Sequence, residues 1–152
     1  MDSKKNSIRL SVCDDFNRRP GLRTRDITPG NSGEDFYHQL LNKKFYEAIT
    51  SGSELVVDLD RTAGYPPSFI DETFGRLVYD FGESLVRKNL ILVSTEEEVW
   101  KETVEKSTIP AWESRRSKGR YPQVTKGYQP GPWWHMQSDG TFVQITDYNQ
   151  CK

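Results

Sequence analysis

Residues 55–81 read LVVDLDRTAGYPPSFIDETFGRLVYDF, and this stretch decides the fold. Its first five residues form a short apolar run, which is typical of a strand inside a parallel sheet. The turn residues Gly64 to Pro67 follow, and apolar residues then recur at helical spacing as far as Phe81. Ser68 and Asp71 have the spacing of a capping box, which predicts that the helix begins at Ser68. The stretch is therefore one strand, one turn and one helix.

A strand followed by a helix is also predicted before this stretch. Ser7–Cys13 alternates apolar and polar residues, as a half-buried strand does. The apolar positions between Phe36 and Ile49 lie on one helical face, and Asn31 or Ser32 is placed to cap that helix.

A third strand and helix are predicted after residues 55–81. Leu90–Val93 predicts a third strand, and Thr95 with Glu98 predicts the cap of a helix over residues 96–107, which Ile109–Pro110 is expected to end. Because strand and helix alternate three times, we expect an α/β fold in which helices pack on a single mixed or parallel sheet in the order β-α-β-α-β-α.

The remainder of the chain has a different character. Before Ala111 there are 15 basic and 19 acidic residues, whereas from Ala111 onward there are 6 basic and 3 acidic residues. Residues 133–137 and 141–146 alternate around Asp139-Gly140, which predicts a β-hairpin. The sequence thus divides into an α/β domain over residues 7–110 and a basic, aromatic-rich extension over residues 111–152.

Composition excludes several classes of protein. The formal net charge is -1, so no overall field draws the chain to nucleic acid or to an anionic membrane. The longest apolar run, Leu90–Val93, is far shorter than the roughly 18 residues of a membrane span, and no export signal is recognisable. The two cysteines, Cys13 and Cys151, predict neither a disulfide framework nor a zinc site. We therefore expect a cytoplasmic protein without a metal or another cofactor.

Six short motifs follow one another at family-like spacing. They are PGLRTR (20–25), SGEDF (32–36), VDLD (57–60), TAGY (62–65), SFIDE (68–72) and FG (74–75). Over roughly residues 8–107 the chain resembles the bacterial and phage STAS-like domain family of unassigned function. The resemblance implies kinship with anti-sigma-factor-antagonist modules, which bind protein partners and are often switched by serine phosphorylation. A GHKL-type ATPase is the partner class that it implies.

The resemblance also suggests site residues. Ser68 is the nearest counterpart of the phosphoacceptor serine of the antagonists, although Pro66-Pro67 precedes it here and it can instead act only as a helix cap. The expected partner-facing surface at the sheet edge consists of Tyr65, Pro67, Phe69, Asp71 and Glu72.

Arg23, Arg25 and Ser32 lie close to the predicted start of the first helix. Guanidinium groups and free backbone N–H donors at such a place can bind a phosphate or carboxylate ligand. Alternatively, the two arginines neutralise Asp58, Asp60 or Glu72. The sequence leaves both interpretations open.

Two rival functions come from other classes. Asp58, Asp60 and Thr62 match the DxDxT motif of Mg²⁺-dependent haloacid-dehalogenase-type phosphatases, and Ser94-Thr95 matches the second motif of that superfamily. The acidic pair that completes the Mg²⁺ site in those enzymes is missing from this sequence. In the extension, basic residues alternate with aromatic ones, including Trp133 and Trp134, and this pattern suits either a nucleic acid or a protein partner. The same tryptophans can instead pack on the domain. Nothing in the pattern determines whether the chain forms a homo-oligomer.

Overall fold

The computed structural model describes residues 6–120 and 122–146. Its core is a parallel sheet of three strands in the order β1-β2-β3, where β1 is Ser7–Ser11, β2 is Glu54–Asp58 and β3 is Leu90–Val93. In the register of the sheet, Val57 lies between Leu10 and Leu92. The predicted α/β class is confirmed, and its parallel form is the one observed.

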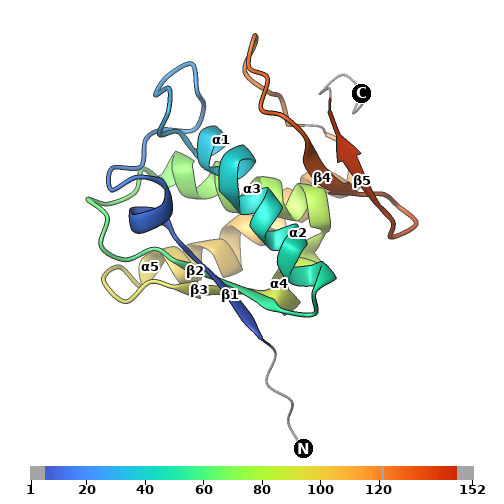
Figure 1. Ribbon diagram of the computed structural model, residues 1–152, viewed down its shortest axis with the longest axis horizontal. Helices are drawn as coiled ribbons and strands as arrows, with labels where there is room; N and C mark the ends of the chain where they lie inside the picture. The colour runs from blue at the N-terminus through green and yellow to red at the C-terminus, as the bar shows by residue number, and fades with distance from the viewer. Residues whose placement is uncertain (1–5, 121, 147–152) are drawn as a thin grey trace, which may run out of the picture.

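Helical segments join the strands (Figure 1). The first run consists of α1 (Gly33–Phe36), the π-helical turn η2 (Tyr37–Leu41) and α2 (Asn42–Thr50). The second consists of α3 (Pro67–Phe81) and α4 (Glu83–Asn89), separated by Gly82. The third consists of α5 (Val99–Thr103), the π-helical turn η3 (Val104–Thr108) and α6 (Ile109–Ser117). A further π-helical turn, η1 (Val12–Phe16), follows β1.

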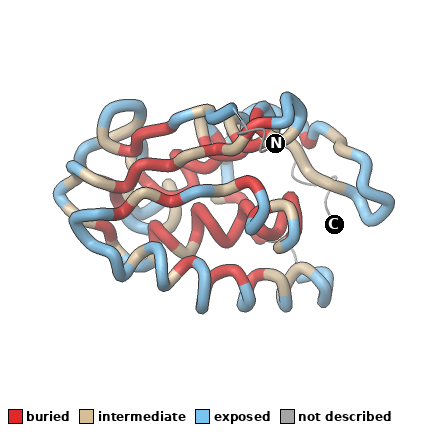
Figure 2. Tube along the Cα trace, turned by 90° about the horizontal axis from the view of Figure 1, so that it is seen from below, coloured by how far each residue is buried: buried red, intermediate tan, exposed pale blue. Residues whose placement is uncertain are grey.

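The two faces of the sheet have different surroundings. Leu10, Val57 and Leu92 share the face that packs on the helices and are at most 6% exposed. On the opposite face, Arg9 and Ile91 are exposed and Val56 is partly exposed. Buried residues concentrate in the middle of the molecule, between the sheet and the helices (Figure 2).

Two predicted helix starts are wrong. The helix α3 begins at Pro67, one residue before Ser68, and Pro66 is its N-cap. The fixed φ of Pro67 suits the first helical position. Ser68 therefore caps nothing. Thr95 does not cap α5, which begins at Val99; instead its hydroxyl and backbone amide donate to Asp60 Oδ2 at 2.5 and 3.1 Å.

The predicted helix end at Pro110 is also wrong. The π-helical turn η3 leads directly into α6, and Pro110 occupies the first turn of α6, where a missing N–H is tolerated. The helical run consequently crosses the boundary placed at residue 110. The short helix α4 was not predicted.

The hairpin prediction is confirmed. It consists of β4 (Trp133–Met136) and β5 (Phe142–Ile145), which pair antiparallel with Trp133 opposite Ile145. Gly140 has a φ of 88°, a conformation that glycine adopts without strain. In the described part of the chain, no helix has the length and apolar character needed to cross a membrane.

Candidate functional site

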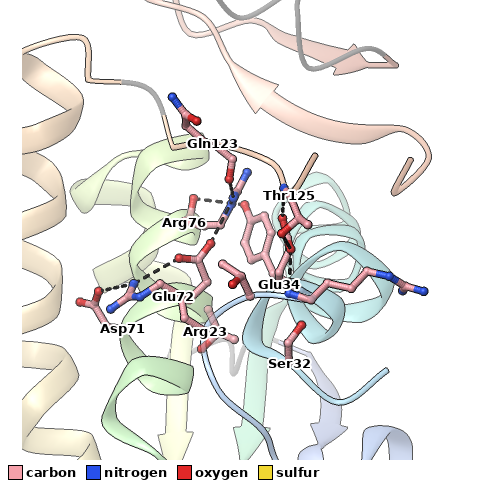
Figure 3. Close-up of polar contacts among 12 residues, drawn as sticks. Arg23, Ser32, Glu34, Asp71, Glu72, Arg76, Gln123 and Thr125 are labelled. Carbon is pink, nitrogen blue, oxygen red and sulfur yellow. Dashed lines mark hydrogen bonds and ion pairs between the residues drawn. The ribbon is translucent and has the colours of Figure 1, made fainter. Parts of the chain in front are cut away.

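Charged side chains gather where α1, α3 and the C-terminal segment (residues 122–146) meet (Figure 3). Arg23 Nη1 donates to Asp71 Oδ2 at 2.8 Å and to Glu72 Oε1 at 3.2 Å. From the other side, Arg76 Nη1 donates to Glu72 Oε2 at 3.1 Å. Two arginines thus share one buried carboxylate, which is the internal ion pairing expected for Arg23 with Glu72.

Arg76 is the most deeply buried charge of this cluster, at 1% exposure. Burial by itself lowers the pKa of its guanidinium, but the neighbouring Glu72 and Asp80 outweigh that effect and raise the pKa above its ordinary value. The same Nη1 also donates to the Gln123 backbone oxygen at 3.2 Å. A charge of the α/β domain is therefore bound to the backbone of the C-terminal segment.

The predicted anion site is filled by a carboxylate of the chain itself. Ser32 caps α1 in a capping box with Asp35, whose Oδ2 accepts from Ser32 Oγ at 2.7 Å and from the Gly30 amide at 2.8 Å. Arg25 Nη1 donates to the other oxygen, Asp35 Oδ1, at 2.8 Å. The structure brings Arg25 and Ser32 together around Asp35, whereas Arg23 turns to α3. Neither arginine pairs with Asp58 or Asp60.

Besides Arg76, sequence reasoning missed Glu34 in this cluster. Its side chain is fully buried, and its Oε1 accepts from the Arg25 amide at 3.0 Å. Thr125 supplies two further donors, its amide to Oε2 at 2.8 Å and its hydroxyl to Oε1 at 2.5 Å. The SGEDF motif at residues 32–36 contained the only available signal, but nothing local indicated that Thr125, 91 positions away, completes the site.

A second set of polar contacts holds the hairpin. Asn42 uses its side-chain amide as a strand would use its backbone: Nδ2 donates to Trp134 O at 2.9 Å, and Oδ1 accepts from Trp134 N at 2.8 Å. His135 Nδ1 lies 2.8 Å from Asp80 Oδ1. Asp80 also accepts the hydroxyl of Tyr37, and burial together with Asp80 raises the pKa of that phenol well above its ordinary value.

For the two tryptophans of β4, the sequence left open a partner-contact surface and packing on the domain, and the structure shows the packed arrangement. Trp133 is 1% exposed, with its ring 4.8 Å from that of His38, and Trp134 stacks on Tyr46 at 3.8 Å. Because neighbouring strand residues point to opposite sides, each ring finds its own apolar contact with the domain or within the hairpin. Tyr121, another aromatic residue of the extension, lies outside the described residues, as does Cys151.

His38 predicts a dependence of stability on pH. The residue is 1% exposed, and neither ring nitrogen has a hydrogen-bond partner in the described structure. Burial, with the charges of Arg76 and Lys43, holds its pKa well below the ordinary 6.5. The unfolded chain therefore takes up a proton near pH 6.5 that the folded chain does not, so stability is complete above that pH and falls as the pH drops below it.

We expect the melting temperature of the wild type to fall between pH 7.5 and pH 5.5, and the fall to be clearly smaller in His38→Phe. The other histidine of the chain supplies the control, since His135→Gln changes an imidazole that has a carboxylate partner. An unchanged pH slope in His38→Phe would refute the assignment.

The carboxyl edge of the sheet carries the remaining predicted residues. A pocket of about 120 Å³ lies there, lined among others by Asp60, Tyr65, Ser94 and Trp100. Of the expected partner-facing residues, Pro67 is exposed and Asp71 is partly exposed. The other three are buried and do not face a partner: Tyr65 is 9%, Phe69 0% and Glu72 5% exposed.

Ser68 was expected to present its hydroxyl to solvent, which is also wrong. Its Oγ is buried in the first turn of α3 and has no hydrogen-bond partner among the described residues.

Asp58 and Asp60 are both held by internal contacts. Asp58 accepts from Arg9 Nη2 at 2.9 Å, and its other oxygen accepts the Asp60 amide at 2.9 Å. Burial tends to raise the pKa of Asp60, but hydrogen bonds from Glu96 and Thr95 outweigh it and lower that pKa. In the described ranges, no three His, Cys, Asp or Glu side chains are grouped as a metal ion requires.

Comparison with known proteins adds one positive finding. Residues 32–100 match the family model described as a STAS-like domain of unknown function. Searches of curated proteins and of solved structures gave no match. The matched range covers β2, β3 and the helices α1 to α4, and it contains Ser32, Glu34, Glu72 and Arg76.

Proposed function

We propose, from the match of residues 32–100 to the STAS-like family model, that the protein is a non-catalytic regulatory module that binds a protein partner, with a GHKL-type ATPase as the partner class. The observation that carries the proposal is a contrast between the charged side chains, which have internal partners, and several apolar side chains, which are exposed to solvent. The charged groups around α1 and α3 are bound internally, whereas large apolar residues are exposed in the loop after β1 and at the start of α5. Leu22 is 40%, Ile27 57% and Val99 55% exposed.

These three residues share one end of the molecule. Leu22 and Ile27 belong to the connection after β1, and Val99 starts the helix after β3. Connections that follow parallel strands leave from the same edge of the sheet. A contiguous apolar patch is typical of a surface for protein recognition, and we propose that these three side chains contribute to one. We therefore assign partner binding to this carboxyl edge, in place of the buried residues Tyr65, Phe69 and Glu72.

Capture of the tagged full-length chain from its own cells tests this proposal. We expect a GHKL-type ATPase to be retained by the wild type and lost by the double variant Ile27→Glu/Val99→Glu. Ile91→Glu is the matched control, because Ile91 is 40% exposed but lies on the open face of the sheet. Absence of such an ATPase, or equal retention by the double variant, would overturn the proposal.

Ser68 is the proposed phosphoacceptor, and its burial specifies how a switch would work. A kinase reaches Ser68 Oγ only when the first turn of α3 opens, and a phosphate of about −2 charge does not return to a buried site that offers it no partner. Phosphorylation is thus expected to hold this turn open beside the partner surface. Ser68→Ala should retain the partner and Ser68→Glu should release it. Equal capture by both variants would exclude the switch.

The proposal also makes a chemical prediction. Since Asp58 is bound to Arg9 and Asp60 to the loop after β3, we expect no Mg²⁺-dependent hydrolysis of p-nitrophenyl phosphate above background. Asp58→Asn should leave that background unchanged. Hydrolysis by the wild type that requires Mg²⁺ and disappears in Asp58→Asn would instead establish the phosphatase alternative.

A further inference from the structure

The C-terminal segment makes its polar contacts with the α/β domain chiefly through its backbone. Gln123 O is bound by Arg76, Thr125 N by Glu34, and both Trp134 N and Trp134 O by Asn42. Side chains add to these contacts: the Thr125 hydroxyl binds Glu34, His135 contacts Asp80, and the Arg25 guanidinium lies over the Tyr128 ring, 4.9 Å from its centroid. Recognition of an extended backbone by fixed polar groups is the way in which many domains bind peptides.

The spacing of the contacts in residues 123–125 has the alternation of a bound strand. The Gln123 carbonyl and the Thr125 amide and hydroxyl face the domain. The intervening Val124 is 8% exposed and belongs to a small apolar cluster with Trp133 and Ile145. This cluster is separate from the main core, which contains Leu10, Val57 and Phe74.

The receiving groups are unusual for an ordinary core. Glu34, Asn42 and Arg76 are at most 1% exposed, and Asp80 is 3% exposed. A fold that needed only stability would gain as much from apolar side chains at these positions, because buried charges are costly to desolvate. All four lie within residues 32–100, whereas the segment that they bind lies outside that range.

We propose that Glu34, Asn42, Arg76 and Asp80 form a peptide-docking surface of the STAS-like domain, and that residues 122–135 of this chain are its resident, exchangeable ligand. The ligand class is an extended peptide with a Thr or Ser two residues after a bound backbone carbonyl and an apolar residue between them. Because the docking surface lies on α1, α2 and α3, this inference does not depend on a partner at the carboxyl edge.

The connection before the segment allows the test to use the whole folded chain. Gly119 has a φ of 68° and no atom within 4 Å of the position of an added Cβ, so a protease recognition sequence inserted there is expected to be tolerated. The purified protein is cleaved after folding. A fluorescent synthetic peptide of residues 120–146 is then added, and its binding is followed by fluorescence anisotropy.

We expect the cleaved protein to retain its circular dichroism spectrum and the labelled peptide to exchange with the resident one. A Thr125→Val peptide should bind about tenfold more weakly or worse, since it loses a hydrogen bond to a buried carboxylate. A Thr141→Val peptide is the matched control, because the Thr141 hydroxyl donates to Gln137 Oε1 and Asp139 Oδ1, which both belong to the hairpin loop and not to the α/β domain. Glu34→Gln in the domain should weaken binding of the unmodified peptide.

Three results would overturn the proposal. The first is loss of the folded spectrum on cleavage, which would make the segment an integral part of the fold. The second is an absence of exchange under native conditions. The third is equal binding of the Thr125→Val and Thr141→Val peptides.

Discussion

Arg76→Met is expected to lower the free energy of unfolding by about 3–5 kcal/mol, the range for breaking one side of a buried ion pair. The methionine keeps much of the side-chain volume, so the loss reports the charge. Glu72 Oε2 loses its donor at 3.1 Å, and the contact between the guanidinium and the Tyr37 ring, 5.6 Å from the centroid, is also lost. Urea denaturation followed by far-UV circular dichroism measures the change.

The chain contains a matched control for this prediction. Arg87 pairs with Glu83 at 2.9 Å in the same i,i+4 arrangement, but both side chains are at least 36% exposed. Exposed helical pairs contribute only about 0.3–0.5 kcal/mol, so Arg87→Met should have a correspondingly small effect. Equal losses in the two variants would show that the buried position of Arg76 is unimportant.

Gly75→Ala is expected to have the other large effect. A Cβ at residue 75 would lie 2.1 Å from Trp112 Nε1, so α6 has to move away from α3. Overpacking of this kind costs about 1–3 kcal/mol or more, and it outweighs the gain of about 1 kcal/mol from helix propensity. The displacement also breaks the hydrogen bond from Trp112 Nε1 to Asp71, which is 3.0 Å long.

A double-mutant cycle gives this prediction its control. If the clash with the indole is the cause, Gly75→Ala combined with Trp112→Leu should be less destabilising than the sum of the two single changes. Gly33→Ala, where the nearest side-chain atom is Glu72 Cβ at 3.2 Å, should cost less than Gly75→Ala. Strict additivity in the cycle would contradict the proposed packing of α6 on α3.

Most of the fold could be predicted because its signals are local. The apolar run around Val57 and the alternation around Leu10 are properties of a few consecutive residues, and the order of strands and helices then implies a parallel sheet. The turn at Asp139-Gly140 is equally local. These elements are found where the sequence analysis expected them.

The failures share a physical cause, which is competition from distant partners. Asp71 has the spacing to cap α3 with Ser68, but Arg23 and Trp112 bind it instead, and they lie 48 and 41 positions away. Thr95 likewise turns to Asp60, 35 positions away. No window of neighbouring residues contains this information.

The site was predicted less completely than the fold for the same reason. For Arg23, Arg25 and Ser32 the sequence left open an anion site and internal ion pairing, and the structure shows internal contacts, with Arg25 and Ser32 on Asp35 and Arg23 on Asp71 and Glu72. Glu34 and Arg76 stood out in no pattern, because their importance comes from burial beneath residues 122–125. For Trp133 and Trp134 the sequence left partner contact and packing on the domain both open, since the docking of the hairpin on α2 and α3 has no local signal.

Native-state hydrogen exchange of the whole chain tests most directly whether the α/β domain holds the C-terminal segment as a separable ligand. The account predicts that the Thr125 and Trp134 amides exchange with one common free energy of opening, below that of the Val57 amide in the middle strand β2. Such a result means that the segment undocks as a unit from a folded domain. Exchange of all three amides at the free energy of global unfolding would contradict the account.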